Sequence, residues 1–178
     1  LVVDPSNTAI LYAGTQRGVL KTTNGGTSWV AVSSGLSLCG ACIAPPISAL
    51  AIDLSNPAIL YAGTYLGSVF KTTNGGTSWI AVNSGFTTTD VRALAIDPFT
   101  PATLYTGTNG GGVFKSTNGG ATWQPTGIGN PAPPATTISI VSGNNQKGTA
   151  GQPLRYPLVV VVTNSSGIPV AGVSVNFA

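Results

Sequence analysis

KTTNGGTSW at Lys21–Trp29 is repeated without change at Lys71–Trp79 and returns as KSTNGGATW at Lys115–Trp123. A second matching segment precedes each copy: ILYAGT at Ile10–Thr15, ILYAGT at Ile59–Thr64 and TLYTGT at Thr103–Thr108. Short apolar runs that recur with a period of roughly 45 residues, separated by Asn-Gly turns, are typical of propeller-like arrays. The repetition therefore predicts a β-rich array of similar units and argues against a single compact enzyme core.

One repeat, read in detail, predicts four antiparallel strands. In the second copy the apolar runs are Ala49–Ile52, Ala58–Ala62, Val69–Thr72 and Ser78–Val82. The Asn-Gly-Gly turn before the last run is a strong hairpin signal, because Asn and Gly tolerate the positive φ that such turns require. Four short antiparallel strands make one propeller blade. We expect Trp79 and its equivalents to fill the space between blades.

The fold class that follows is all-β: three four-stranded antiparallel propeller blades that make an incomplete propeller over residues 1–127. The blades are expected at about residues 1–36, 49–85 and 93–127, with an insertion at 37–48. A Pro-rich segment, TGIGNPAPPATT, predicts a linker at about residues 128–137. Alternating apolar runs return over residues 138–178 and predict a second, separate β-rich unit.

The pattern [ST]-x-[DN]-x-G-x-[ST]-W resembles the Asp-box, or BNR, repeat of sialidases, sortilin-type receptors, tandem-propeller xyloglucanases and photosystem II assembly factors. The surrounding DPSN, LYAGT and GGVFKST segments are most similar to the xyloglucanase and assembly-factor branches. The resemblance implies a structural hairpin in every blade and identifies no activity. Its residues here are Thr22, Asn24, Gly26 and Trp29; Thr72, Asn74, Gly76 and Trp79; and Ser116, Asn118, Gly120 and Trp123.

All three boxes carry Asn where that family usually has Asp. Asn keeps the carbonyl oxygen that accepts hydrogen bonds from the turn but lacks the negative charge. We therefore expect the turn without an ion site, and we predict no metal and no cofactor.

Residues 138–178 resemble the opening part of a bacterial immunoglobulin-like domain of the invasin and intimin type. The similarity rests on SGNNQKGTAGQPL from Ser142 and on GIPVAGVSVNF from Gly167. A complete sandwich of that kind needs about 100 residues, so the resemblance implies a partial domain.

The insertion contains Cys39 and Cys42, a C-x-x-C pair. Such a pair fits a redox motif, half of a zinc site or a local disulfide. Zinc needs about four ligands, and the chain has two Cys and no His. We favour the disulfide, which would stiffen an extracellular loop.

Composition limits the partners. Only 6% of the residues are charged and the net charge is +3, without the clustered Lys and Arg that nucleic-acid binding requires. No apolar run approaches the roughly 20 residues that span a bilayer. A neutral surface rich in Thr, Ser and Asn suits a protein outside the cell, so we expect a secreted or cell-surface location, no nucleic acid and no membrane insertion.

Catalysis within the chain is not expected. Glycoside hydrolysis usually needs two carboxylates that flank one bond, and the chain has no Glu and four Asp. Asp4, Asp53 and Asp97 occupy equivalent turns of separate repeats, and Asp90 has Arg92 as its neighbour on the same strand face. We favour a non-catalytic structural or adhesive protein. The alternative is part of a secreted, xyloglucanase-like polysaccharide-degrading enzyme or a glycan-binding propeller, for which Tyr65 and Phe86 are candidate sugar contacts.

Three blades do not close a propeller, so the two end blades would each present an apolar face to water. Two explanations remain open: the chain is part of a longer protein that supplies the missing blades, or copies of the chain complete one another. In the second case the partner is another copy of the chain, joined through open blade faces or donated strands, and a contact that fails to close would give a filament.

Overall fold

A computed structural model describes residues 1–37, 44–86, 90–128, 137–142 and 159–163. The chain divides into two compact units, Leu1–Asn130 and Pro131–Ala178. The described residues form strands and turns and contain no helix, which confirms the all-β class. Accordingly, this part of the chain has no helix long and apolar enough to cross a membrane.

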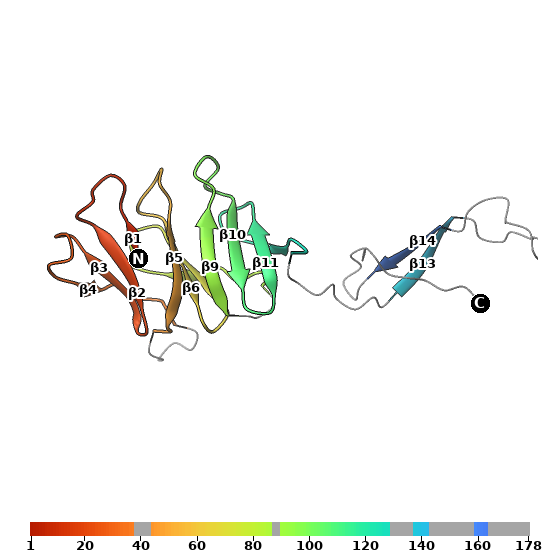
Figure 1. The fold of residues 1–178 in the computed structure, drawn as a ribbon, viewed down its shortest axis with the longest axis horizontal. Coiled ribbons are helices and arrows are strands. Elements are labelled where there is room, and N and C mark those ends of the chain that lie inside the picture. The colour runs from red at the N-terminus through yellow and green to blue at the C-terminus, as the bar shows by residue number, and fades with distance from the viewer. Residues whose placement is uncertain (38–43, 87–89, 129–136, 143–158, 164–178) are drawn as a thin grey trace, which may run out of the picture. The chain divides into compact units, whose positions relative to one another are not determined.

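The first unit contains three four-stranded antiparallel sheets, each built from strands consecutive in the chain. They follow one another along the unit in chain order (Figure 1). The first blade comprises β1 (Val2–Val3), β2 (Leu11–Thr15), β3 (Gly18–Thr22) and β4 (Val30–Ala31). The second comprises β5 (Ile47–Ile52), β6 (Leu60–Thr64), β7 (Val69–Thr72) and β8 (Ile80–Ala81). The third comprises β9 (Val91–Ile96), β10 (Leu104–Thr108), β11 (Gly112–Ser116) and β12 (Gln124–Pro125).

The registers of the three sheets are the same, which shows that the repeats are structurally equivalent. Tyr12 pairs with Lys21 and Tyr61 with Lys71, and Tyr105 pairs with Lys115 in the third blade. Residues paired across neighbouring strands lie on the same face of a sheet. Each blade therefore has two distinct faces with a repeated set of side chains.

We call the face directed toward the preceding blade the leading face and the other the trailing face. Leading-face residues are Leu11, Leu20 and Trp29; Leu60, Phe70 and Trp79; and Leu104, Phe114 and Trp123. Trailing-face residues are Tyr12, Val19 and Lys21; Tyr61, Val69 and Lys71; and Tyr105, Val113 and Lys115. The two core clusters combine the trailing face of one blade with the leading face of the next. The core is thus formed between blades and not within them.

Three expected strands of the second blade have wrong bounds: the run Ala58–Ala62 is observed as β6, Leu60–Thr64, and the first and fourth strands also differ. Strand β5 begins at Ile47, inside the expected insertion, and its register shifts between Ile47 and Ala49. The fourth strand of the second blade is limited to Ile80–Ala81, so Trp79 precedes the strand. Trp79 is held in the turn because its backbone N–H donates to the Ser34 carbonyl of the first blade.

The second unit has one described antiparallel pair, β13 (Thr137–Ser142) and β14 (Val159–Thr163). Its register shifts between Ile140 and Ser142. The immunoglobulin-like assignment of residues 138–178 stays a prediction, because most of these residues, and most of the predicted linker, lie outside the described ranges.

Thr106 in β10 is a local defect in the repeat. Its equivalents are Ala13 and Ala62, and its hydroxyl is buried with no hydrogen-bond partner in the described part of the chain. An unsatisfied buried polar group costs about 1–3 kcal/mol. We expect Thr106→Val, which keeps the shape and removes the hydroxyl, to raise the thermal midpoint by about 3 °C.

Circular dichroism melting would measure this shift. The matched control is Thr108→Val on the same strand, because the Thr108 hydroxyl donates to the Gly112 carbonyl at 2.8 Å. That variant should lose stability. A Thr106→Val protein that melts below the parent would contradict the view that the Thr106 hydroxyl is unsatisfied and destabilising.

Candidate functional site

The repeated hairpin is closed by its Asn side chain. In the second blade the Thr72 hydroxyl donates to Asn74 Oδ1 at 2.8 Å, and the Ser78 backbone N–H donates to the same oxygen at 2.9 Å. Asn74 Nδ2 donates to Ser78 Oγ at 2.9 Å, and the Gly76 N–H donates to Thr72 Oγ1 at 3.1 Å. The same bonds recur in the other blades, in Thr22, Asn24, Gly26 and Ser28 and in Ser116, Asn118, Gly120 and Thr122.

This arrangement uses both ends of each amide within the turn. The Asn oxygen accepts two hydrogen bonds and the Asn nitrogen donates one, so the hairpin needs no ion to hold its shape. Within the described ranges no group of three or more His, Cys, Asp or Glu side chains lies close enough to hold a metal. Cys39 and Cys42, and with them the predicted disulfide, lie outside these ranges.

The hairpins of the second and third blades are also the points at which the preceding blade binds them. The Tyr12 hydroxyl and the Lys21 ammonium both donate to the Gly75 carbonyl at 3.2 Å. Tyr61 and Lys71 donate to the Gly119 carbonyl at 3.0 and 3.1 Å. Each Lys lies over the ring of its Tyr, 5.1 and 5.3 Å from the ring centre. Hydrogen bonds with a charged donor are roughly twice as strong as neutral ones, so a Tyr–Lys pair is a strong clamp on the hairpin.

The hairpin tryptophans complete the interblade contact. The Trp79 indole N–H donates to the Val32 carbonyl, and that of Trp123 donates to the Val82 carbonyl, both at 2.8 Å. Their side chains are 3% and 0% exposed, whereas Trp29 is 37% exposed. The expectation of a buried tryptophan in every blade is therefore wrong for Trp29, because no blade precedes it in the structure.

Three of the four Asp carboxylates accept hydrogen bonds within turns of their own blades. Asp53 Oδ1 accepts from the Ser55 N–H, the Ser55 hydroxyl and the Asn56 N–H. Asp4 and Asp97 hold the equivalent turns of the other blades. The hydrogen bond from the Ser6 side chain lowers the pKa of Asp4, and that from the Thr100 side chain lowers the pKa of Asp97. The lowered pKa values favour the ionised form of Asp4 and Asp97, which does not suit a general acid.

The fourth carboxylate, Asp90, forms a surface ion pair. Its Oδ2 accepts from Arg92 Nη2 at 2.9 Å, as the sequence predicts. The Arg92 guanidinium also lies 4.9 Å from the centre of the Tyr65 ring. This stacking places a cation on Tyr65, one of the two aromatic residues considered for sugar contact.

The other candidate aromatic, Phe86, packs inside the protein. Its ring is stacked on Phe114 with centres 4.8 Å apart and meets Trp123 edge-on at 5.3 Å. Phe86 therefore extends the core between the second and third blades. Its contacts with Phe114 and Trp123 favour packing over sugar binding as its role.

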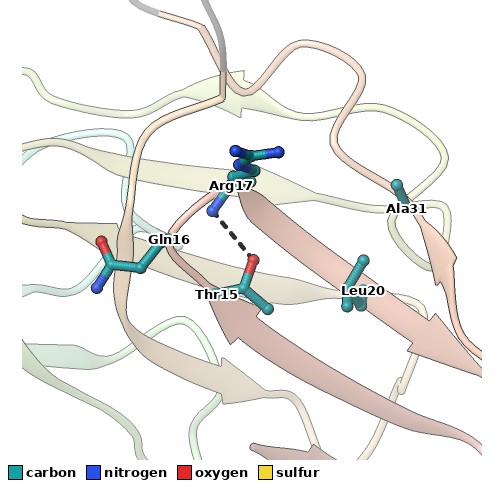
Figure 2. Close-up of a pocket in the computed structure, with 5 residues that line it drawn as sticks. All are labelled: Thr15, Gln16, Arg17, Leu20 and Ala31. Carbon is teal, nitrogen blue, oxygen red and sulfur yellow. Dashed lines mark hydrogen bonds between the residues drawn. The ribbon is translucent and has the colours of Figure 1, made fainter.

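A hollow lies on the leading face of the first blade. Figure 2 shows the five residues that line it, Thr15, Gln16, Arg17, Leu20 and Ala31. The Arg17 backbone N–H donates to Thr15 Oγ1 at 3.1 Å and fixes the turn at one side (Figure 2). In the second blade the equivalent of Leu20 is Phe70, whose side chain is buried against the first blade. The hollow thus lies on the face that, in the second and third blades, packs against the preceding blade.

The three sheets, their common register and the interblade core define a propeller-type fold. No protein-family model and no curated protein matches the sequence. Among solved structures, the chain is similar to an ancestral GH74 enzyme, with 27% identity and a TM-score of 0.58 over 94% of this chain and 24% of that chain. The GH74 enzyme of Niastella koreensis matches with 26% identity and a TM-score of 0.52 over 69% of this chain and 21% of that chain.

A structure of YCF48 bound to a D1 peptide shares the fold, with 17% identity and a TM-score of 0.50 over 69% of this chain and 42% of that chain. The GH74 xyloglucanase of Xanthomonas campestris matches with 20% identity and a TM-score of 0.54 over 72% of this chain and 23% of that chain. These similarities confirm the predicted resemblance to xyloglucanase-type propellers at the level of the fold. The chain spans about a quarter of the GH74 enzymes that it matches.

Proposed function

We propose that this chain is a non-catalytic structural section of a secreted or cell-surface propeller protein. The observation that carries the proposal is the state of its carboxylates. All four Asp side chains lie within the described residues, and each is engaged by its own blade or by Arg92. The chain has no Glu. Glycoside hydrolysis needs one carboxylic acid and one carboxylate that face each other across a bond.

The hydroxyl-rich hairpins and the low charge favour a role in which the propeller surface makes contacts outside the cell. In this proposal residues 138–178, with their resemblance to immunoglobulin-like domains, act as a spacer that follows the blades in the chain. The structural or adhesive role of the protein then depends on the blade surfaces and not on a reaction centre.

A second candidate function is a section of a xyloglucan-degrading enzyme. The similarity to GH74 enzymes, one of which is a xyloglucanase, favours it. In that case the catalytic carboxylates come from blades outside the 178 residues, and the section present here contributes scaffold or substrate contacts.

A hydrolysis assay tests the proposal directly. The chain should release no reducing ends from xyloglucan above the background of an Asp90→Asn variant, which removes the one carboxylate not used in a turn. Release by the parent chain that disappears in the variant would overturn the non-catalytic assignment. Saturable binding of xyloglucan oligosaccharides, measured by calorimetry, would favour the second candidate function over the first.

A further inference from the structure

Two complementary faces of the first unit are uncovered. On the leading face of the first blade, Trp29 is 37% exposed, while its equivalents Trp79 and Trp123 are buried. On the trailing face of the third blade, Tyr105 is 38% exposed, while Tyr12 and Tyr61 are both 2% exposed. Each uncovered face thus repeats a surface that is buried elsewhere in the same chain.

The uncovered trailing face has two hydrogen-bond donors without an acceptor, and the uncovered leading face has a carbonyl that matches them. In the described part of the chain, neither the Tyr105 hydroxyl nor the Lys115 ammonium has a hydrogen-bond acceptor, although Lys115 keeps the position over the Tyr105 ring at 5.4 Å. Their equivalents in the first two blades both bind a hairpin carbonyl. The uncovered trailing face therefore presents two donors already set for one carbonyl oxygen.

The matching acceptor lies on the uncovered leading face. Gly25 is the equivalent of Gly75 and Gly119, the two residues whose carbonyls the clamps bind. A Cβ atom added to Gly75 would lie 3.2 Å from Tyr12 Oη and 3.3 Å from Lys21 Nζ, whereas one added to Gly25 would meet nothing within 4 Å. The space that a Tyr–Lys clamp occupies beside the other hairpins is open beside this one.

The Trp29 contact has a matching acceptor as well. Trp79 and Trp123 donate to the carbonyls of Val32 and Val82, whose own N–H groups bond to Val19 and Val69. Thr126 has the same place in the third blade, because its N–H donates to the Val113 carbonyl at 2.9 Å. The Thr126 carbonyl is therefore positioned to accept the Trp29 indole N–H of a following blade.

We propose that the trailing face of the third blade binds the leading face of the first blade of a second copy of this chain. Tyr105 and Lys115 donate to the Gly25 carbonyl of the second copy, and Trp29 of the second copy donates to the Thr126 carbonyl. Leu20 and its hollow (Figure 2) close onto the same contact.

The chain itself indicates this occupant. Each uncovered face repeats a surface that a neighbouring blade of the same sequence covers elsewhere in the first unit, so another blade of this sequence fits it. Two copies joined at both pairs of faces give six blades, within the usual range of four to eight for propellers. A head-to-tail contact that closes gives a ring.

Light scattering coupled to size-exclusion chromatography tests this on the full chain. We expect a particle of twice the 17.8 kDa chain mass at tens of micromolar. Leu20→Arg damages the leading face and Tyr105→Arg the trailing face, and each variant alone should be a monomer with an unchanged circular dichroism spectrum. An equimolar mixture should form dimers again, because one undamaged pair of faces remains. A parent chain that stays monomeric, as it would if missing blades cover these faces, or a mixture that stays monomeric, would overturn the proposal.

A milder pair of variants isolates the clamp. Tyr105→Phe removes one hydrogen bond from each contact and should weaken dimerisation by about 5- to 10-fold for each contact affected. Tyr65→Phe is the matched control, because Tyr65 is also 38% exposed and lies away from both faces. Equal effects of the two substitutions would contradict the role assigned to Tyr105.

Discussion

Trp79→Ala is expected to destabilise the first unit by about 3–5 kcal/mol, the usual cost of removing a buried aromatic side chain. The side chain is 3% exposed and belongs to the core between the first and second blades. Its removal also leaves the Val32 carbonyl without the indole donor. Because the core lies between blades, the loss should loosen the docking of the first blade onto the second.

The chain supplies its own control. Trp29→Ala alters the same position of an identical nonapeptide, but this tryptophan is 37% exposed. We expect it to cost about 1 kcal/mol or less. Equilibrium urea unfolding of both variants in the Tyr105→Arg background would keep any association out of the comparison. Equal losses for the two substitutions would show that the tryptophans act within their own blades and not between blades.

The sequence alone was sufficient for the sheets. The repeated Asn-Gly-Gly turns and the apolar runs between them predict four strands for each repeat, and the structure has three such sheets in chain order. Local signals of this kind act over a few residues, since turn chemistry and side-chain alternation need no knowledge of the neighbours. They predicted the third strand of the second blade, Val69–Thr72, with its observed bounds.

The contacts between repeats could not be read in the same way. Tyr61 and Lys71 recur in every repeat, which indicates a structural role but not a partner. Their target, the Gly119 carbonyl, lies in the next repeat and is a backbone atom, so no side-chain pattern marks it. The joint recurrence of a Tyr and a Lys on paired strands was the one signal available for this clamp.

Trp29 and Trp79 also show that local sequence does not determine the burial of a side chain between blades. The two residues have identical local sequences, yet their exposure differs because only one of them has a blade in front of it. Local sequence sets the hairpin, and the neighbouring blade sets the burial. The sequence therefore predicts that the end blades have open faces, but the residues on those faces and their hydrogen-bonding partners follow only from the structure.

Gly85→Ala is expected to be among the most damaging single-methyl changes in the described part of the chain, at about 3–5 kcal/mol. Gly85 has φ of 84°, a conformation that costs other residues about 1–2 kcal/mol. In addition, a Cβ atom at this position would lie 2.2 Å from the carbonyl oxygen of Trp123. That oxygen belongs to the backbone of the next blade, so it cannot move aside without shifting the hairpin.

The shift would also affect the neighbouring backbone hydrogen bond. The Trp123 N–H donates to the Ser84 carbonyl at 2.8 Å. Separation of the two backbone segments at Gly85 would lengthen this hydrogen bond and move Trp123 out of its buried position. The control is Gly127→Ala, where φ is 80° and an added Cβ would meet nothing within 4 Å. It should cost only the backbone strain of about 1–2 kcal/mol. Urea midpoints that fall equally for both variants would mean that backbone strain accounts for the whole effect and that the second and third blades are not in close contact at Gly85.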